Sequence, residues 1–135
     1  MLTGIDKILL DVPLRRSLDG RRVALLAHPA SMTSDFRHSL DALFATSLNM
    51  TAAFGPQHGM RGDKQDNMME TVDDRDARHD ISVFSLYGEV RRPTAAMLDT
   101  FDVLLVDIQD VGCRIYTFLT TVCYLLEDCA RAGKS

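Results

Sequence analysis

Polar side chains are concentrated in one short stretch of this sequence, residues 54–63, which reads FGPQHGMRGD. Glycines and a proline bend the backbone there, and the hydrogen-bonding side chains are Gln57, His58, Arg61 and Asp63. Connecting loops usually carry Ser, Asn, Gly or Lys, whereas polar groups on a rigid, glycine-shaped turn are typical of binding sites. The stretch therefore predicts a binding site.

Two further polar clusters also follow apolar runs directly. HPAS begins with His28, and DIQDVGCR carries Asp107, Gln109, Asp110 and Arg114. An ionised carboxylate beside a buried strand is costly unless it is paired or used. We therefore expect Asp107 and Asp110 to act in catalysis or binding, with Arg114 as the charge partner of one of them. Asp110 could equally cap the helix that follows.

The side chains of the first stretch have plainer interpretations as well. His58 can donate a hydrogen bond or carry a proton, or it can brace the loop. An Arg61–Asp63 pair could tie the turn to itself instead of contacting a ligand. The histidines of the chain lack spacings such as HxxxH or HExxH, so we predict no metal site.

The elements that must position these residues can be predicted from apolar runs. VALLA at residues 23–27 lies between Gly20 and Pro29, which is typical of a strand buried on both faces of a parallel sheet. Further strands are predicted over 50–54, 82–88 and 101–106. Residues 61–80 are polar and without period, which indicates a long functional or mobile loop.

Segments whose apolar residues have helical spacing lie between these strands. A helix is predicted over residues 34–47 with Ser34 or Asp35 as its N-cap, and a short one begins after Pro93 and Thr94. A closing helix is predicted from the apolar positions between residues 116 and 130, and Gly133 is its expected stop signal. Tyr116, at the start of this helix, either faces a cleft or packs half-buried. The expected buried stripe of that helix comprises Leu119, Val122, Cys123, Leu126 and Cys129.

Strands that alternate with helices predict an α/β fold with an open, mostly parallel sheet and flanking helices. The 135 residues fall within the usual range of a single domain. In such sheets, ligands bind outside the carboxyl ends of the strands. Because each of the three polar clusters follows a strand, we expect Gln57, His58, Arg61, Asp107 and Asp110 to converge on one rim.

Composition narrows the class of partner. The 15 Lys and Arg residues are scattered among 19 Asp and Glu, for a net charge of -4, which argues against nucleic acid. The three cysteines lack CxxC spacing, so we expect buried thiols in a reducing compartment and no disulfide. The sequence shows no signal peptide and no apolar run long enough for a membrane span, which predicts a cytoplasmic protein without a membrane partner.

Four motifs in order resemble a family of exo-β-N-acetylmuramidases of bacterial cell-wall recycling, formerly a domain of unknown function. They are GRRVALLAHPAS, AAFGPQHGMRGD against the family signature G-P-E-H-G-x-R-G-D, VFSLYGEVRRPTAAML, and FDVLLVDIQDVGCRIYTFLTT. The resemblance implies a Rossmann-like N-terminal domain and a second domain that closes the cleft. Residues 1–135 would be the first portion of the N-terminal domain, with the C-terminal domain of the family absent.

The resemblance also implies a reaction and roles. The family function would be hydrolysis of terminal N-acetylmuramic acid from peptidoglycan fragments, without a cofactor, on a muropeptide or amino-sugar ligand. Family members can be exported. By this resemblance the catalytic candidates are Gln57, His58, Asp107 and Asp110, and the substrate-binding candidates are His28, Arg61, Asp63, Gln109, Arg114 and Tyr116. Arg61 would bind the lactyl carboxylate of the muramic acid.

The sequence departs from the family at one decisive position. A glycosidase usually needs two carboxyl groups, yet the signature acid is replaced by Gln57, whose amide cannot transfer a proton. Hydrolysis is therefore expected to be weak or absent. The alternatives are a non-catalytic carbohydrate-binding or vestigial fragment, or a nucleotide-binding α/β module, although no G-x-G-x-x-G follows a strand. Uncovered strand faces also predict self-association, or a partner chain that covers the sheet.

Overall fold

A computed structural model describes residues 2–62, 73–113 and 115–135. Its centre is a five-stranded sheet in the order β3-β4-β2-β1-β5. Strands β1 (Arg22–Ala27), β2 (Asn49–Gly55), β4 (Ile81–Ser85) and β5 (Val103–Asp107) run parallel, and β3 (Asp74–Asp76) pairs antiparallel with β4. This architecture confirms the predicted α/β fold with a mostly parallel sheet.

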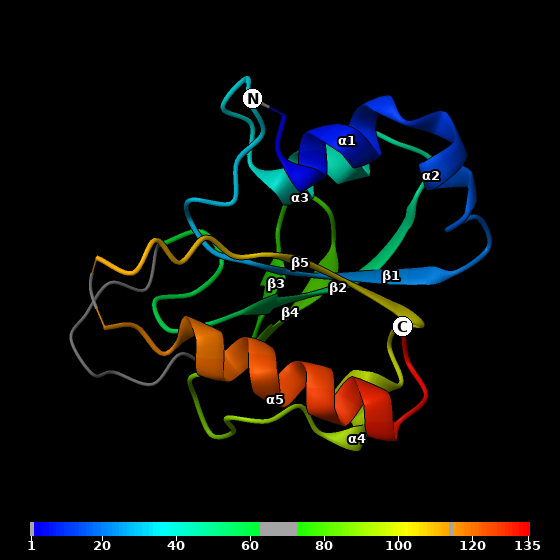
Figure 1. The fold of residues 1–135 in the computed structure, drawn as a ribbon. Coiled ribbons are helices and arrows are strands. Elements are labelled where there is room, and N and C mark those ends of the chain that lie inside the picture. The colour runs from blue at the N-terminus through cyan, green and yellow to red at the C-terminus, as the bar shows by residue number, and fades with distance from the viewer. Residues whose placement is uncertain (1, 63–72, 114) are drawn as a thin grey trace.

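Helices cover both faces of the sheet (Figure 1). One face carries α1 (Gly4–Leu10), α2 (Val12–Arg16) and α3 (Ser39–Phe44), and the other carries α4 (Ala95–Leu98) and α5 (Phe118–Arg131). Two apolar clusters fill the layers. Alternate residues of β1 enter opposite clusters: Leu25 packs with residues of α1 and α3, and Leu26 packs with residues of α4 and α5. The unbroken apolar run of β1 is thus explained by burial on both faces.

The parallel register places the carboxyl ends of three strands at one edge of the sheet. Leu26 of β1 is paired with Phe54 of β2, and Ala27 is paired with Asp107 of β5. The turns that begin at His28, Pro56 and Ile108 therefore leave the sheet side by side. This confirms the expectation that the three polar clusters share one rim, although individual side chains point in different directions there.

Helix α3 starts later than its sequence spacing predicts. The prediction of an N-cap at Ser34 or Asp35 is wrong, because Met32 and His38 form an isolated bridge and Phe36 has a φ of 62°. The chain makes a tight turn in this segment before the helix begins, and His38 is the N-cap. Phe36 had the spacing of a buried helical residue, which led to the wrong prediction. In the structure Phe36 belongs to the turn and is 84% exposed.

The amino-terminal helices were not predicted, although their capping signals are visible in the sequence. Thr3 and Asp6 form a capping box at α1, and Asp11 caps α2, which has Pro13 in its first turn. Asp6 also accepts hydrogen bonds from the backbone amide and hydroxyl of Ser34, at 3.0 and 3.1 Å. Helix α1 is thereby fixed to the turn that precedes α3.

The buried face of α5 differs from the predicted stripe. Phe118, Thr121, Leu125 and Cys129 are buried, whereas the predicted core residues Leu119, Cys123 and Leu126 are exposed. One side of the helix packs on the sheet, and the helix also carries apolar residues on sides that the sheet does not cover. The expectation of buried thiols is likewise wrong for Cys113 and Cys123. All three cysteines are free.

No helix among the described residues is long and apolar enough to cross a membrane.

Candidate functional site

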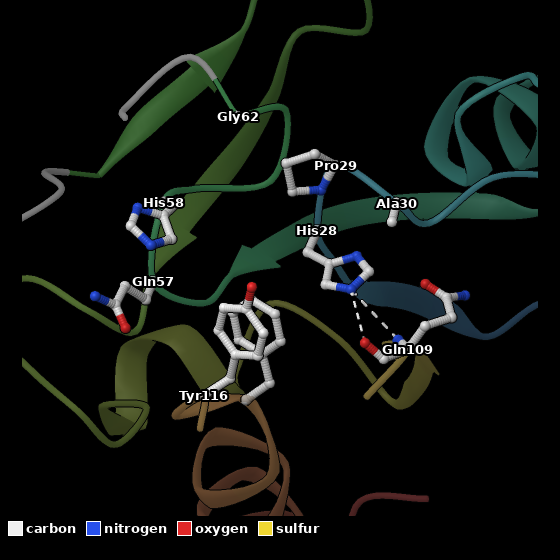
Figure 2. Close-up of a pocket in the computed structure, with 9 residues that line it drawn as sticks. His28, Pro29, Ala30, Gln57, His58, Gly62, Gln109 and Tyr116 are labelled. Atoms are coloured by element: carbon white, nitrogen blue, oxygen red, sulfur yellow. Dashed lines mark hydrogen bonds between the residues drawn. The ribbon is translucent and has the colours of Figure 1, made fainter. Parts of the chain in front are cut away.

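A pocket of about 440 Å³ opens at the rim where the three strands end (Figure 2). Each polar cluster contributes to it, together with the residues that lead into α5. The lining residues are His28, Pro29, Ala30, Gln57, His58, Gly62, Gln109, Tyr116 and Phe118. The structure therefore brings together five of the predicted site residues: His28, Gln57, His58, Gln109 and Tyr116.

The turn after β2 is shaped by its glycines. A Cβ atom on Gly55 would lie 2.8 Å from the backbone nitrogen of Met60, so only glycine allows the turn to fold back on its strand. His58 and Gly59 then both have a positive φ, 72° and 75°. A non-glycine residue in this region is uncommon and is often found at functional sites. The contorted backbone presents the side chains of Gln57 and His58 to the pocket.

His28 occupies the base of the pocket and connects the first turn to the third. Its Nδ1 lies 3.1 Å from the Ser31 hydroxyl, and that hydroxyl donates to the carbonyl of Asp107. Its Nε2 lies 3.2 Å from the carbonyl oxygen and 3.4 Å from the backbone nitrogen of Gln109. His28 is buried, and its contacts connect these turns.

An aromatic wall faces the two histidines. The rings of Tyr116 and Phe118 are stacked, with centroids 4.9 Å apart and planes 6° apart, and the edge of Phe118 meets His28. Phe118 is buried and Tyr116 is 39% exposed, so the outer ring is open to the pocket. Both interpretations of Tyr116 therefore hold in part, because it packs on one face and lines the pocket as well.

Gln57 is hydrogen-bonded across the pocket mouth. The hydroxyl of Thr117 donates to Oε1 of Gln57 at 3.2 Å, which joins the second turn to the segment before α5. The NH₂ group of the amide offers two donors and no acceptor. At this position the chain can hold a ligand by hydrogen bonds.

Asp107 and Asp110 do not line the pocket. The carboxylate of Asp107 accepts from the hydroxyl of Ser39 and, at 2.8 Å, from the side-chain amide of Gln109. Asp110 accepts from the backbone N–H of Gly112 at 3.0 Å, so it shapes its own loop and does not cap α5, which begins at Phe118. Each carboxylate thus accepts at least one hydrogen bond from a neighbouring group of the chain. The catalytic role of Asp107 and Asp110 stays a prediction.

Arg61 also lies outside the pocket lining, in a cluster of charges behind the second turn. Its guanidinium makes two hydrogen bonds to Asp41, at 2.7 and 3.1 Å, and another to Asp76 at 2.9 Å. Hydrogen bonding to Arg61, with further help from His79, holds the pKa of Asp41 well below its usual range. This network ties the second turn to α3 and β3, which differs from the predicted contact of Arg61 with a ligand.

Two predicted site residues, Asp63 and Arg114, lie outside the described residues. Within residues 2–62, 73–113 and 115–135, no group of three or more His, Cys, Asp or Glu side chains could hold a metal ion. Thr117 and Phe118 also contact the predicted residues, although their sequence positions did not predict it. The stack of Tyr116 on Phe118 gives no periodic signal, because Tyr116 lies in the segment before α5 and Phe118 is the first residue of that helix.

Comparison with known proteins gives a consistent result. Residues 23–135 match the family model "Exo-beta-N-acetylmuramidase NamZ, N-terminal". The chain is 39% identical over 134 residues to the peptidoglycan β-N-acetylmuramidase NamZ of Bacillus subtilis strain 168, which covers 97% of this chain and 31% of that protein. The chain thus spans about a third of the length of this relative.

Two crystal structures from Bacteroides fragilis NCTC 9343, both of DUF1343 family proteins, are similar in fold. BF0371 matches with a TM-score of 0.85 and 35% identity, and BF0379 with a TM-score of 0.76 and 29% identity. Each match covers 99% of this chain and 33% of the other. The similarity therefore extends over all elements of the fold, including the rim that carries the pocket.

Proposed function

Since the chain belongs to the family of exo-β-N-acetylmuramidase NamZ N-terminal domains, we propose that its rim pocket recognises the terminal N-acetylmuramic acid of peptidoglycan fragments. The observation that carries this proposal is the convergence of three strand-end turns on one pocket, at the place where open α/β sheets bind ligands. The named relative acts on peptidoglycan, and the pocket offers the mixture of groups that an amino sugar requires.

The polar groups of the pocket suit the substituents of a sugar. The NH₂ of Gln57 and the imidazole of His58 can bind hydroxyl, acetamido or carboxylate oxygens. The exposed ring of Tyr116 supplies an apolar surface for the C–H face of the pyranose. An open pocket with few polar groups and an aromatic wall is the usual composition of a small-molecule site.

Hydrolysis by this chain should be weak or absent. Cleavage of a glycosidic bond needs a proton donor at the leaving oxygen, and such a group contributes about 10²- to 10⁴-fold in rate. By its resemblance to the family signature, Gln57 stands at the position of the acid, and Asp107 and Asp110 do not line the pocket. Among the described residues of the second turn, His58 is the pocket side chain that can transfer a proton.

Chimeras can test the chemical part of this proposal. Residues 1–135 would replace the matching third of the Bacillus subtilis relative, either unchanged or with Gln57→Glu. The variant chimera should release N-acetylmuramic acid from a muramyl-glucosamine disaccharide at least about 100-fold faster than the unchanged chimera. Equal turnover by both would show that the proton chemistry lies elsewhere, with Asp107 and Asp110 the next residues to substitute.

A non-catalytic sugar-binding role is the second candidate. The hydrogen bond from Thr117 to Gln57 favours it, because the amide is integrated into the pocket wall as a fixed hydrogen-bonding group. Under this alternative the chain binds N-acetylmuramic acid, and the chimera with Gln57 binds the disaccharide without cleaving it. Calorimetric titration of the inactive chimera with the disaccharide distinguishes a binding module from a vestigial one.

A further inference from the structure

His38 lies behind the pocket, between two of the turns that form it. It is the N-cap of α3 and is buried. Its Nε2 is 3.2 Å from the carbonyl oxygen of His28 in the first turn and 3.2 Å from the carbonyl oxygen of Met60 in the second. One imidazole thus contacts the backbone of both turns, although 10 and 22 residues separate it from them in sequence.

The hydrogen-bond pattern fixes the tautomer of this ring. The backbone N–H of Leu40 donates to Nδ1 at 3.3 Å, so Nδ1 must be unprotonated. The ring proton is therefore on Nε2, where it is shared between the two carbonyl oxygens. Only the neutral Nε2–H form satisfies the amide of Leu40 and both carbonyls, since a doubly protonated ring would direct an N–H at the N–H of Leu40.

The charges around His38 favour the same form. Burial, together with the Arg61 guanidinium, lowers the pKa of His38, while the carbonyls of His28 and Met60 and the carboxylate of Asp41 oppose that shift. Arg61 belongs to the second turn and Asp41 to α3, so the ring meets one charge of each sign. At neutral pH the imidazole is uncharged and can act as a permanent donor.

The next residue extends the connection to the third turn. Ser39 donates its hydroxyl to the carboxylate of Asp107, and its backbone N–H donates to the carbonyl of Ser31 at 2.9 Å. The N-cap and the first residue of α3 therefore contact the first two turns and the last residue of β5, from which the third turn leaves, and neither lines the pocket.

We infer that His38 is a positioning residue, whose neutral imidazole holds the His28 turn and the Gln57–His58 turn at the separation that the pocket requires. Its effect on sugar binding rests on the proposed function, whereas its effect on the turns does not. Sequence alone does not reveal this role, because His38 follows no strand and belongs to no polar cluster.

The test compares three variants of the whole chain. His38→Leu removes the donor, and His38→Gln restores an N–H that can reach the carbonyls. Thr51→Val is the matched control: the Thr51 hydroxyl donates to the carbonyls of Thr100 and Val23, at 2.8 and 3.4 Å, near the opposite end of the sheet. It therefore also removes a side-chain link between backbone segments, but away from the pocket.

Backbone amide spectra and titration with N-acetylmuramic acid give two independent readouts. His38→Leu should shift the amides of residues 28–31 and 57–60 and weaken sugar binding by about tenfold, the equivalent of one or two lost hydrogen bonds. His38→Gln should restore most of the amide positions and most of the sugar affinity. Thr51→Val should lower the melting temperature and leave both readouts unchanged. Pocket amides that stay in place in His38→Leu, or that move as far in Thr51→Val, would overturn the inference.

Two results separate this inference from the proposed function. If the unchanged chain binds no N-acetylmuramic acid, the proposed function fails, and the amide spectra alone decide the role of His38. If His38→Leu does not fold, long-range ¹H–¹⁵N spectra of the unchanged chain still identify the protonated ring nitrogen. A proton on Nδ1 of His38 at neutral pH would contradict the inference, and a proton on Nε2 would support it.

Discussion

Gly62 of the second turn packs against the ring of Pro29 in the first, so closely that a Cβ atom on Gly62 would lie 2.8 Å from Cγ of Pro29. Both residues line the pocket. The two turns are therefore in direct contact on the pocket side, while His38 joins them from behind. The width of the pocket depends on this contact, since neither the backbone of a turn nor a proline ring can yield easily.

Gly62→Ala should separate the two turns. Gly62 has a φ of 73°, so alanine there would incur backbone strain as well as the clash with Pro29. Gly20→Ala is the control, because Gly20 has a φ of 75° and a Cβ atom added to it would meet no atom within 4 Å. We expect Gly20→Ala to cost about 1–2 kcal/mol in the free energy of unfolding and Gly62→Ala about 1–3 kcal/mol more, measured in urea. Equal losses would show that the contact with Pro29 relaxes freely.

Arg61 should matter for stability more than an exposed arginine does. Arg61→Ala leaves Asp76, whose side chain is 5% exposed, without its guanidinium partner. We expect a loss of about 2–4 kcal/mol in the free energy of unfolding. Arg75→Ala removes an exposed pair with Asp80 and should change the free energy of unfolding little. Similar losses for the two variants would mean that the charge cluster behind the second turn contributes little.

Acid should weaken the attachment of α1. Hydrogen bonds from Ser34 and Thr3 lower the pKa of Asp6 to about 2. The carboxylate therefore stabilises the fold at pH values above its unfolded pKa of about 4, and the effect disappears as the pH falls to about 2. Melting temperatures of the unchanged chain and of Asp6→Asn should differ at pH 6 and converge near pH 2. The exposed Asp19 provides the control, since Asp19→Asn should change little at either pH.

The outer surface of α5 should promote self-association. Leu119 and Leu126 are 64% and 54% exposed on this helix. An exposed apolar stripe favours contact between copies of the chain. We expect sedimentation to show association that increases with concentration and decreases in Leu126→Glu. A stable monomer at all concentrations would contradict this prediction.

Sequence patterns predicted the parts of the fold that depend on local hydrophobicity. The apolar runs of β1, β2 and β5 lie where expected, and α4 begins directly after Thr94 as predicted. The start of α3 was mispredicted because Phe36 kept helical spacing inside a turn. The buried face of α5 was mispredicted because the helix is apolar on more than one side, and periodicity does not tell which side meets the sheet.

The site was predicted at the level of turns and less well at the level of side chains. Motifs at strand ends correctly indicated the rim, because the ends of parallel strands meet at one edge. The direction of each side chain depends on partners distant in sequence. Arg61 turns toward Asp41 and Asp76, and Asp107 turns toward Ser39, and none of these pairings has a signal in spacing. The role of His38 is hidden for the same reason.

The central claim is that the rim pocket binds N-acetylmuramic acid, and amide spectra of the 135-residue chain during titration with this sugar test it most directly. We predict saturable shifts that cluster at His28, Gln57, His58, Gln109 and Tyr116, and that are lost in His58→Ala. Thr51, near the opposite end of the sheet, should show no shift. Saturable shifts at another surface, or no shifts at millimolar sugar, would contradict the claim.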